Sequence, residues 1–295
     1  MKATHHGLDC WMYNTPQLYK LRIDELILPG THDSGADKKA PTPTLPQEKT
    51  QDVPVIEQIL AGFRVLDLRV VFSADAPIGS DKRFQLFHLT SSGRTVGGDV
   101  LAPLNDFYDD PDHKAARAKE IVILNFHKFK HFNRAVHQEL HSLIDSKIGQ
   151  RLVPRNWRRS TLEDIWTHRP ERTVVIAYNH RVRAKYWKGV KHQWSGQNLN
   201  TTEALKTFMD EQSAREKPDF VLRSIQCAKY VLPFHLPDDF SEKIDEWFES
   251  RDSNSYIQRF HIINTDWSTR SRIVFNCMHA NGIKAMAKAD NLNAG

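Results

Sequence analysis

Two histidines, their neighbouring acids and one arginine are the residues best suited to chemistry. An imidazole can take up or release a proton near neutral pH, so His32 and His88 can act as base and acid. A carboxylate bonded to the other ring nitrogen would orient each ring. The guanidinium of Arg69 offers a fixed fork of donors that matches two phosphate oxygens. This set suits transfer at a phosphodiester without a metal, because no carboxylate cluster of the kind that Ca²⁺ or Mg²⁺ requires is apparent.

These side chains must be positioned by secondary structure, and each lies at or near the end of a predicted strand. Short β-rich apolar runs alternate with stretches of helical periodicity, which is typical of βα units around a parallel sheet. Strands are predicted at 25–29, 63–72, 84–88, 121–126, 173–178, 220–226 and 261–266, with an eighth candidate at 230–234 that Pro233 weakens. Helices are predicted at 54–61, 133–148, 161–167, 202–212, 240–250 and 271–281.

The pattern predicts an α/β protein with one (β/α) barrel of about eight strands over residues 1–295, with its core at about 21–285. The carboxyl ends of barrel strands form the active-site face, and five predicted strand ends carry reactive side chains there. Asp67 and Arg69 alternate within one strand, so both point to the same face. A structural ion pair is the alternative for these two residues, but a hydrated site explains two charges in one strand at lower cost.

Composition narrows the class of protein without identifying it. The 295 residues carry 41 Lys and Arg against 36 Asp and Glu, and this net charge of +5 favours an anionic partner or simply a soluble surface. Cys10, Cys227 and Cys277 match no zinc spacing and are predicted to be free thiols. A secretory signal and a spanning helix are not apparent. The localisation therefore stays open between export without a visible signal and a cytoplasmic protein that binds membranes peripherally.

Three segments resemble the signature of a known enzyme family. Leu28-Pro-Gly-Thr-His-Asp-Ser-Gly35, Arg64-Val-Leu-Asp-Leu-Arg69 and Phe87-His88 look like the motifs of the phosphatidylinositol-specific phospholipase C X domain in its metal-independent bacterial form. The resemblance is specific from about Leu21 to Phe126 and weaker up to Asp266. It implies a single distorted (β/α)8 TIM barrel without a cofactor. It also implies cleavage of phosphatidylinositol to diacylglycerol and inositol 1,2-cyclic phosphate, with the inositol 2-hydroxyl as nucleophile.

The resemblance also implies a role for individual residues. His32 resembles the general base, oriented by Asp266, and His88 resembles the general acid, with Asp33 as its partner. Arg69 resembles the arginine that stabilises the pentacoordinate phosphate.

Substrate binding is expected from a second set of residues. Asp67 and Lys128 resemble the polar support around the arginine and the inositol. Asn179 and Gln226 occupy strand ends where the family usually has an arginine, an aspartate and a stacking tyrosine. The reaction centre therefore matches the family, while the head group could be that of a related inositol phospholipid or a glycosylated inositol lipid anchor.

A basic segment at 181–191 is expected to meet a membrane. It holds five cations and no acid, and Lys185, Tyr186, Trp187 and Lys188 have the types that settle at an anionic lipid surface. The alternative is a solvated basic loop whose aromatic rings pack inward. The same composition suits single-stranded nucleic acid. Since the catalytic motifs favour lipid, we expect a peripheral membrane surface as partner and no nucleic acid.

Two alternative functions are consistent with the same scaffold. Another barrel phosphodiesterase could use a metal, but Glu25 and Asp67 alone do not supply the acidic ligands that this chemistry needs. A catalytically inactive lipid-binding barrel is the second alternative. The unmatched inositol contacts favour it slightly, whereas the presence of both histidines, Arg69 and both partner acids argues against it.

Overall fold

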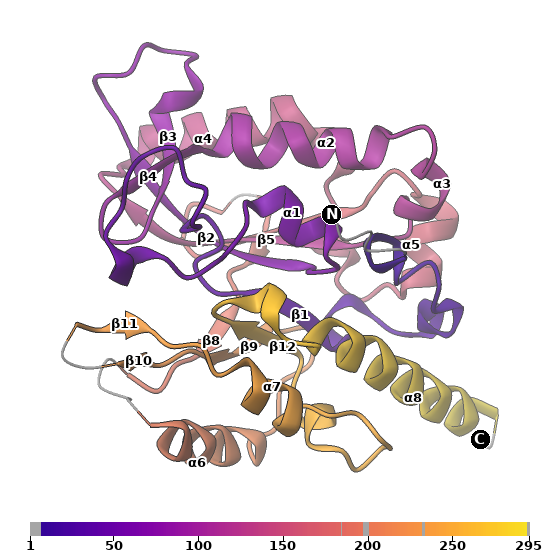
Figure 1. Ribbon diagram of the computed structural model, residues 1–295. Helices are drawn as coiled ribbons and strands as arrows, with labels where there is room; N and C mark the ends of the chain where they lie inside the picture. Colours follow the sequence, from indigo (N-terminus) through magenta and orange to yellow (C-terminus); the bar gives the residue numbers. More distant parts are fainter. Residues whose placement is uncertain (1–6, 184, 197–200, 232–233, 294–295) are drawn as a thin grey trace.

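Eight parallel strands form the central sheet of the protein (Figure 1). The computed structural model describes residues 7–183, 185–196, 201–231 and 234–293. Within the sheet the order is β7-β6-β5-β2-β1-β12-β9-β8, and every neighbouring pair in it is parallel. These strands are β1 (Leu28–Thr31), β2 (Val65–Phe72), β5 (Val122–Lys130), β6 (Val174–Tyr178), β7 (Trp187–Lys188), β8 (Lys191–Gln193), β9 (Arg223–Cys227) and β12 (Ile262–Thr265).

The sheet curls into a distorted barrel because its two end strands are consecutive in the chain. Only Gly189 and Val190 separate β7, which pairs with β6, from β8, which pairs with β9. At this junction the amide of Val190 donates to Oδ1 of Asn125, 3.1 Å away. Gly189 passes so close to Asn179 that a Cβ atom at 189 would lie 2.7 Å from the Cα of Asn179. Glycine therefore permits the bend that closes the barrel, and the expected fold is confirmed.

Helices cover the outside of the barrel. In Figure 1, α2 and α4 lie on one side of the sheet, while α6, α7 and α8 lie on the opposite side. The six predicted helices are confirmed, and α2 and α3 are additional. The helices are α1 (Val55–Leu60), α2 (Ala102–Asp109), α3 (Lys114–Arg117), α4 (Arg134–Ile148), α5 (Leu162–His168), α6 (Thr202–Ser213), α7 (Ser241–Trp247) and α8 (Ile273–Asn293).

Local sequence signals explain how some of these elements begin. At the start of α5, the hydroxyl of Thr161 accepts from the amide of Asp164, and the carboxylate of Asp164 accepts from the amide of Thr161.

Short 3-10 helices occur at Leu8–Cys10, Pro16–Lys20, Ile23–Glu25, Pro46–Glu48, Asp81–Arg83, Gly149–Arg151, Arg155–Trp157, Tyr256–Arg259 and Ser268–Arg270, and a π-helical turn spans Val96–Leu101.

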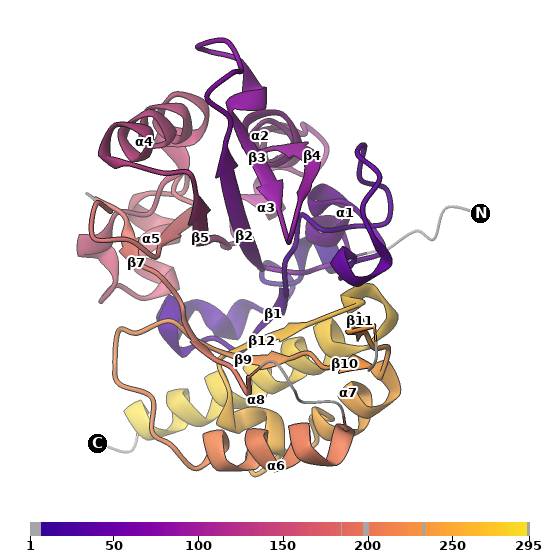
Figure 2. The same ribbon diagram turned by 90° about the vertical axis from the view of Figure 1, so that its left-hand side faces the viewer.

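The prediction that 84–88 is a parallel barrel strand is wrong. The segment forms β3 (Phe84–Phe87), which pairs antiparallel with the end of β2 and with β4 (Ser91–Thr95). Only three residues connect β3 to β4, and a parallel crossover needs a dozen or more. Figure 2 shows this hairpin beside β2, on the outer side of the barrel. It nevertheless places His88 at the mouth.

The candidate strand at 230–234 is also corrected. Tyr230–Val231 forms β10, which pairs antiparallel with β11 (Leu236–Pro237) in a separate two-stranded sheet. Residues 232 and 233 of the candidate lie outside the described residues. The two missing barrel strands are instead β7 and β8 at 187–193, within and just beyond the segment predicted as a membrane-binding loop.

Because that segment joins the sheet, its aromatic residues are buried. Tyr186 donates to Oδ1 of Asp145, 3.1 Å away, and the indole of Trp187 donates to the carbonyl of Val153. Lys185 pairs with the same Asp145 at 3.0 Å, while Lys188 is exposed. Ala184 lies outside the described residues. Tyr186 and Trp187 are therefore not available to a lipid surface, which corrects that expectation.

Two further expectations concern the whole chain. The three cysteines are buried free thiols, as predicted. Within the described ranges, no helix has both the length and the hydrophobicity needed to cross a membrane.

Candidate active site

A cleft of about 830 Å³ opens at the carboxyl ends of the barrel strands. It contains seven of the nine residues predicted for catalysis or substrate binding, and Asp33 and Asp266 lie directly behind its wall. The fold thus brings together side chains that are up to 234 positions apart in the chain. The seven that line the cleft are His32, Asp67, Arg69, His88, Lys128, Asn179 and Gln226.

Alternation along β2 explains how two charged side chains reach the cleft. Leu66 and Leu68 pack outward into the hydrophobic cluster beneath the outer helices. Asp67 and Arg69 therefore point into the barrel, since successive side chains of a strand face opposite sides. Both line the cleft, as the sequence predicts.

His32 is held between an acid and the arginine. Its Nδ1 lies 2.7 Å from Oδ1 of Asp266, and its Nε2 lies 2.9 Å from Nη2 of Arg69. Because a guanidinium can only donate, Nε2 of His32 is the acceptor in that contact. The proton of the neutral ring is therefore on Nδ1 and is donated to Asp266. This tautomer leaves Nε2 with the lone pair that a base requires.

Burial and charge act in opposite directions on His32. Burial lowers the pKa of its imidazole, but the adjacent Asp266 carboxylate outweighs burial and leaves the pKa raised above the ordinary histidine value. The same competition applies to Arg69, where burial lowers the pKa but Asp33 and Asp67 raise it overall. Arg69 therefore stays charged at the centre of the site.

Asp33 connects Arg69 to the second histidine. Its Oδ2 lies 3.3 Å from Nη1 of Arg69 and 3.6 Å from Nε2 of His88. The other ring nitrogen of His88, Nδ1, lies 3.2 Å from the carbonyl of Glu48. A protonated His88 can thus donate to a carbonyl on one side and face a carboxylate on the other. Within the described part of the chain, Oδ2 of Asp33 has no hydrogen-bond partner.

The backbone at Asp33 and directly after Asp266 has an unusual conformation, and hydrogen bonds from neighbouring segments hold it in place. Asp33 and Trp267 have positive φ angles of 46° and 48°, a region that residues other than glycine seldom occupy. The side-chain amide of Gln51 donates to the carbonyls of His32 and Thr265 and so ties β1 to β12. Such conformations persist where surrounding contacts fix them, and they concentrate at functional sites.

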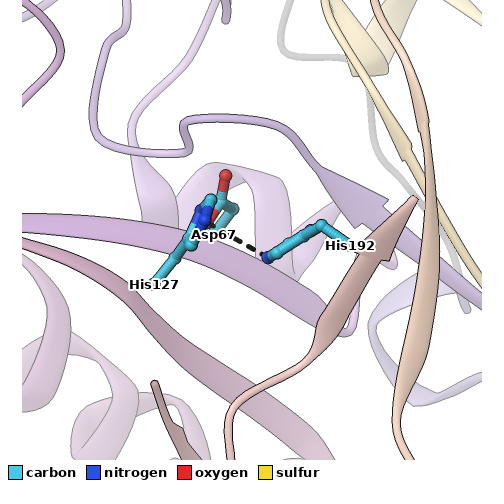
Figure 3. Close-up of side chains that lie close together, drawn as sticks. All are labelled: Asp67, His127 and His192. Carbon is cyan, nitrogen blue, oxygen red and sulfur yellow. Dashed lines mark hydrogen bonds and ion pairs between the residues drawn. The ribbon is translucent and has the colours of Figure 1, made fainter. Parts of the chain in front are cut away.

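A second cluster in the cleft includes two histidines that the sequence reasoning did not assign. Oδ1 of Asp67 lies 3.1 Å from Nδ1 of His127 and 4.0 Å from Nε2 of His192, as Figure 3 shows. His127 directly follows the predicted strand 121–126, but its type and position alone assign it no role. His192 was missed because its segment resembled a loop. A carboxylate between two imidazoles is a group that can bind a proton, a hydroxyl or a cation.

The protonation of Asp67 and His192 follows from their surroundings. Burial raises the pKa of Asp67, but His127 and Arg69 lower it well below the ordinary value, so this carboxylate is ionised. Burial lowers the pKa of His192 to about 3, so the ring is neutral. Its Nδ1 lies 2.7 Å from the hydroxyl of Ser224 and also contacts the amide of Gln226.

The remaining predicted substrate-binding residues surround this cluster. The amide of Asn179 donates to the carbonyl of His127 at 3.1 Å, and Lys128 is exposed at the cleft edge. Trp194, which was not predicted, stacks on His32 with ring centroids 5.7 Å apart. It also makes an edge contact with Tyr230, another lining residue. The cleft therefore combines hydrogen-bonding groups with two aromatic rings.

Sequence comparison identifies relatives of this chain. No protein-family model matches the sequence. "PI-PLC X domain-containing protein 1" of Homo sapiens is 25% identical over 231 residues, which cover 69% of this chain and 67% of the relative. "PI-PLC X domain-containing protein 2" of Homo sapiens is 25% identical over 240 residues, covering 70% and 73%. The match thus spans about two thirds to three quarters of these relatives, and it confirms the resemblance carried by the motifs.

Solved structures share the fold. The phosphatidylinositol-specific phospholipase C from Listeria monocytogenes superimposes with a TM-score of 0.65 at 16% identity, covering 94% of this chain and 98% of that one. The F249X mutant of the enzyme from Staphylococcus aureus gives 0.63 at 15% identity, covering 92% and 97%. The distorted barrel is therefore the architecture of these bacterial enzymes.

Proposed function

Because the chain is a homologue of the PI-PLC X domain-containing proteins, we propose that it is a phospholipase C that cleaves phosphatidylinositol or a related inositol phospholipid. The observation that carries this proposal is the continuous chain of contacts Asp266, His32, Arg69, Asp33 and His88. It places a guanidinium between two imidazoles, each beside its own carboxylate. That is the set of groups needed to deprotonate a nucleophile, bind a phosphate and protonate a leaving group.

In the first half of the proposed reaction, Nε2 of His32 takes the proton of the inositol 2-hydroxyl. The hydroxyl oxygen forms a new bond to phosphorus. Asp266 holds Nδ1 of His32 and stabilises the positive charge that develops on the ring. When no substrate is bound, the lone pair on Nε2 of His32 accepts a hydrogen bond from Nη2 of Arg69. The incoming phosphate would attract Arg69 to its own oxygens and free the base at the moment of binding.

In the second half, the bond between phosphorus and the glycerol oxygen breaks. His88 gives its proton from Nε2 to that oxygen, and diacylglycerol leaves. Asp33 lies beside both His88 and Arg69, so its carboxylate helps to position the acid next to the guanidinium that binds the phosphate. The product is inositol 1,2-cyclic phosphate, and the proton transfers require no metal ion.

The head group is proposed to lie on the other side of Arg69. There the cleft offers the polar groups Lys128, Asn179, His192 and Gln226, with the ring of Tyr230 at its edge. Ammonium, amide and imidazole groups are suited to bind the several hydroxyls of a sugar-like ring.

A membrane is proposed to contact the rim of the cleft rather than segment 181–191. Leu89 and Phe234 are 58% and 71% exposed, and each adjoins or lines the cleft. Leu45 is also exposed and lies next to the short helix Pro46–Glu48, which contacts β11. Exposed apolar side chains that gather around one opening are typical of an interaction surface. We call Leu45, Leu89 and Phe234 the apolar rim.

The decisive experiment measures the product. The chain is treated with chelator and incubated with phosphatidylinositol vesicles, and phosphorus NMR follows the lipid. A cyclic phosphate signal is expected, with rates at least ~10²-fold lower for His32→Ala and for His88→Ala. His113→Ala, at an exposed histidine paired with Asp110, is the matched control and should leave the rate unchanged.

Other outcomes would identify the alternatives. Vesicle binding without any product would indicate an inactive lipid-binding barrel. A linear phosphate product formed only with added metal would indicate another type of phosphodiesterase. Either result would contradict the proposed chemistry.

A further inference from the structure

Three ligand atoms converge on the floor of the cleft, beside the proposed acid–base groups. Oδ1 of Asp67, a ring nitrogen of His127 and a ring nitrogen of His192 all lie within 4.8 Å of one another (Figure 3). The residues come from β2, β5 and β8, three strands of the barrel. Their spacing is therefore set by the sheet and not by a flexible loop.

The hydrogen bonds of Asn125 reveal the tautomer of His192. Oδ1 of Asn125 accepts from the amide of Val190, so its Nδ2 faces His192 and donates to Nε2 at 2.8 Å. Nε2 of His192 is therefore unprotonated, and its proton is on Nδ1, which faces the hydroxyl of Ser224 and the side-chain amide of Gln226, whose oxygen is the atom able to accept that proton. Nε2 lies 4.0 Å from the negatively charged Oδ1 of Asp67, while its lone pair accepts from Asn125. A cation bound between these two atoms would interact favourably with both, in place of the hydrogen bonds that they now accept.

The surroundings of these ligands have the features of a metal site. The second ring nitrogen of His192 is fixed by Ser224, as is usual for a metal-bound imidazole. The other oxygen of Asp67 faces the amide of Asp33 and Arg69, which leaves Oδ1 to the histidines.

We propose that Asp67, His127 and His192 bind one divalent transition-metal ion of the zinc or cobalt class. Two imidazole nitrogens with one carboxylate suit these ions, whereas Ca²⁺ and Mg²⁺ prefer oxygen ligands. In a tetrahedral zinc site with bonds of ~2.0–2.1 Å the ligand atoms lie about 3.3 Å apart. The separations of 3.1 Å and 4.0 Å from Oδ1 of Asp67 are close to that value. Binding requires two changes: His192 exchanges its bond from Asn125 for the metal, and His127 moves its proton from Nδ1, which donates to the ionised Asp67, to Nε2.

Three protein ligands leave at least one coordination position open toward the cleft. Water, or an oxygen of the molecule bound there, would fill it. The ion would lie on the Asp67 side of Arg69, away from the proposed transfers at His32 and His88. The inference concerns metal binding by the protein alone and does not rest on lipid cleavage.

The test titrates the full chain, stripped with chelator, with Zn²⁺, Co²⁺, Ca²⁺ and Mg²⁺ by calorimetry without lipid. We expect one Zn²⁺ per chain, bound at least ~100-fold more tightly than Ca²⁺ or Mg²⁺. Co²⁺ should give the visible absorption of a site with nitrogen ligands. Absence of stoichiometric Zn²⁺ binding, or equal affinity for Ca²⁺, would overturn the proposal.

Variants locate the site. His127→Asn removes a ligand whose side chain is 31% exposed, so it disturbs packing least, and it should weaken Zn²⁺ binding by more than ~100-fold. Ser224→Ala removes one of the two groups that position Nδ1 of His192 and leaves the three ligands in place, and we expect a loss of about 10-fold. His113→Ala controls for adventitious binding by surface histidines. Unchanged Zn²⁺ affinity in the His127→Asn variant, with its circular dichroism spectrum intact, would place the ion elsewhere and refute the assignment.

Discussion

Nδ1 of His32 lies 2.7 Å from Oδ1 of Asp266, although 234 positions separate the two residues in the chain. Both follow neighbouring strands, β1 and β12, whose parallel register places Thr31 beside Thr265. The contact is therefore a direct result of barrel topology. It determines which nitrogen of His32 carries the proton, and it controls the pH at which that ring becomes neutral.

Asp266→Asn should slow the proposed reaction by ~10²- to 10⁴-fold, because the amide no longer orients the ring or stabilises its charged form. The measurement is kcat on phosphatidylinositol vesicles, with Glu163→Gln on the exposed start of α5 as control. A loss below about threefold would show that Asp266 is not a partner of the base.

The pH profile gives an independent test of the same contact. The pKa of His32 is raised, so the low-pH limb of kcat/KM should lie above the ordinary histidine value of ~6.5. Asp266→Asn should move this limb to lower pH, because burial then acts without the opposing carboxylate. A limb that does not move would contradict the assignment. The stability from this pair has a related dependence: it is fully present below pH ~6.5 and is lost as pH rises through the raised pKa.

Asp33→Asn tests the second carboxylate at constant shape. Asparagine tolerates the φ of 46° at this position, so the variant removes charge and leaves the backbone unstrained. We expect kcat to fall by at least ~10²-fold, because His88 and Arg69 lose their shared acid. Thermal melting of the variant should differ little from that of the parent. Full activity would assign Asp33 a role in loop structure alone.

If the apolar rim contacts the membrane, substitutions in it should weaken vesicle binding without slowing cleavage of a soluble substrate. Leu89→Ser combined with Phe234→Ser should weaken vesicle binding by about 10-fold or more, since each side chain contributes ~1.5–3 kcal/mol when fully buried. Cleavage of a short-chain soluble substrate should be unchanged. Met286→Ser, at an exposed apolar residue on α8, is the control. Equal vesicle binding by parent and double variant would locate the membrane contact elsewhere.

We predict that stability depends on an ion pair at the amino ends of β2 and β5, at the opposite end of these strands from the cleft. Arg64 and Glu120 are both fully buried and lie 2.8 Å apart. Glu120→Gln leaves the guanidinium without its counter-charge and should reduce the free energy of unfolding by about 3–5 kcal/mol. Urea denaturation measures this, and Glu163→Gln should change it by less than ~0.5 kcal/mol. An average substitution costs ~1 kcal/mol, so a smaller loss in Glu120→Gln would contradict this role.

The barrel class and the residues proposed for catalysis could be predicted from the amino-acid sequence. The buried runs around Leu66 and Ile123 are long enough to signal strands, and strand ends of a parallel sheet meet on one face regardless of detail. The helix that begins at Thr161 could also be predicted, because a hydroxyl and a carboxylate three residues apart cap its first turn. The contacts of His32 with Asp266 and of His88 with Asp33 agree with the pairings that the family resemblance implied.

The closure of the barrel and the full set of side chains that face the cleft could not be predicted in this way, because both depend on contacts between distant segments. The closing segment at 187–193 pairs in stretches of two and three residues, too short for any periodicity, and its partners β6 and β9 lie elsewhere in the chain. Its basic and aromatic composition is that of a surface loop, yet pairing buries Trp187 and brings His192 beside Asp67. Burial and proximity of this kind arise from contacts between distant segments, and no local pattern in the sequence encodes them.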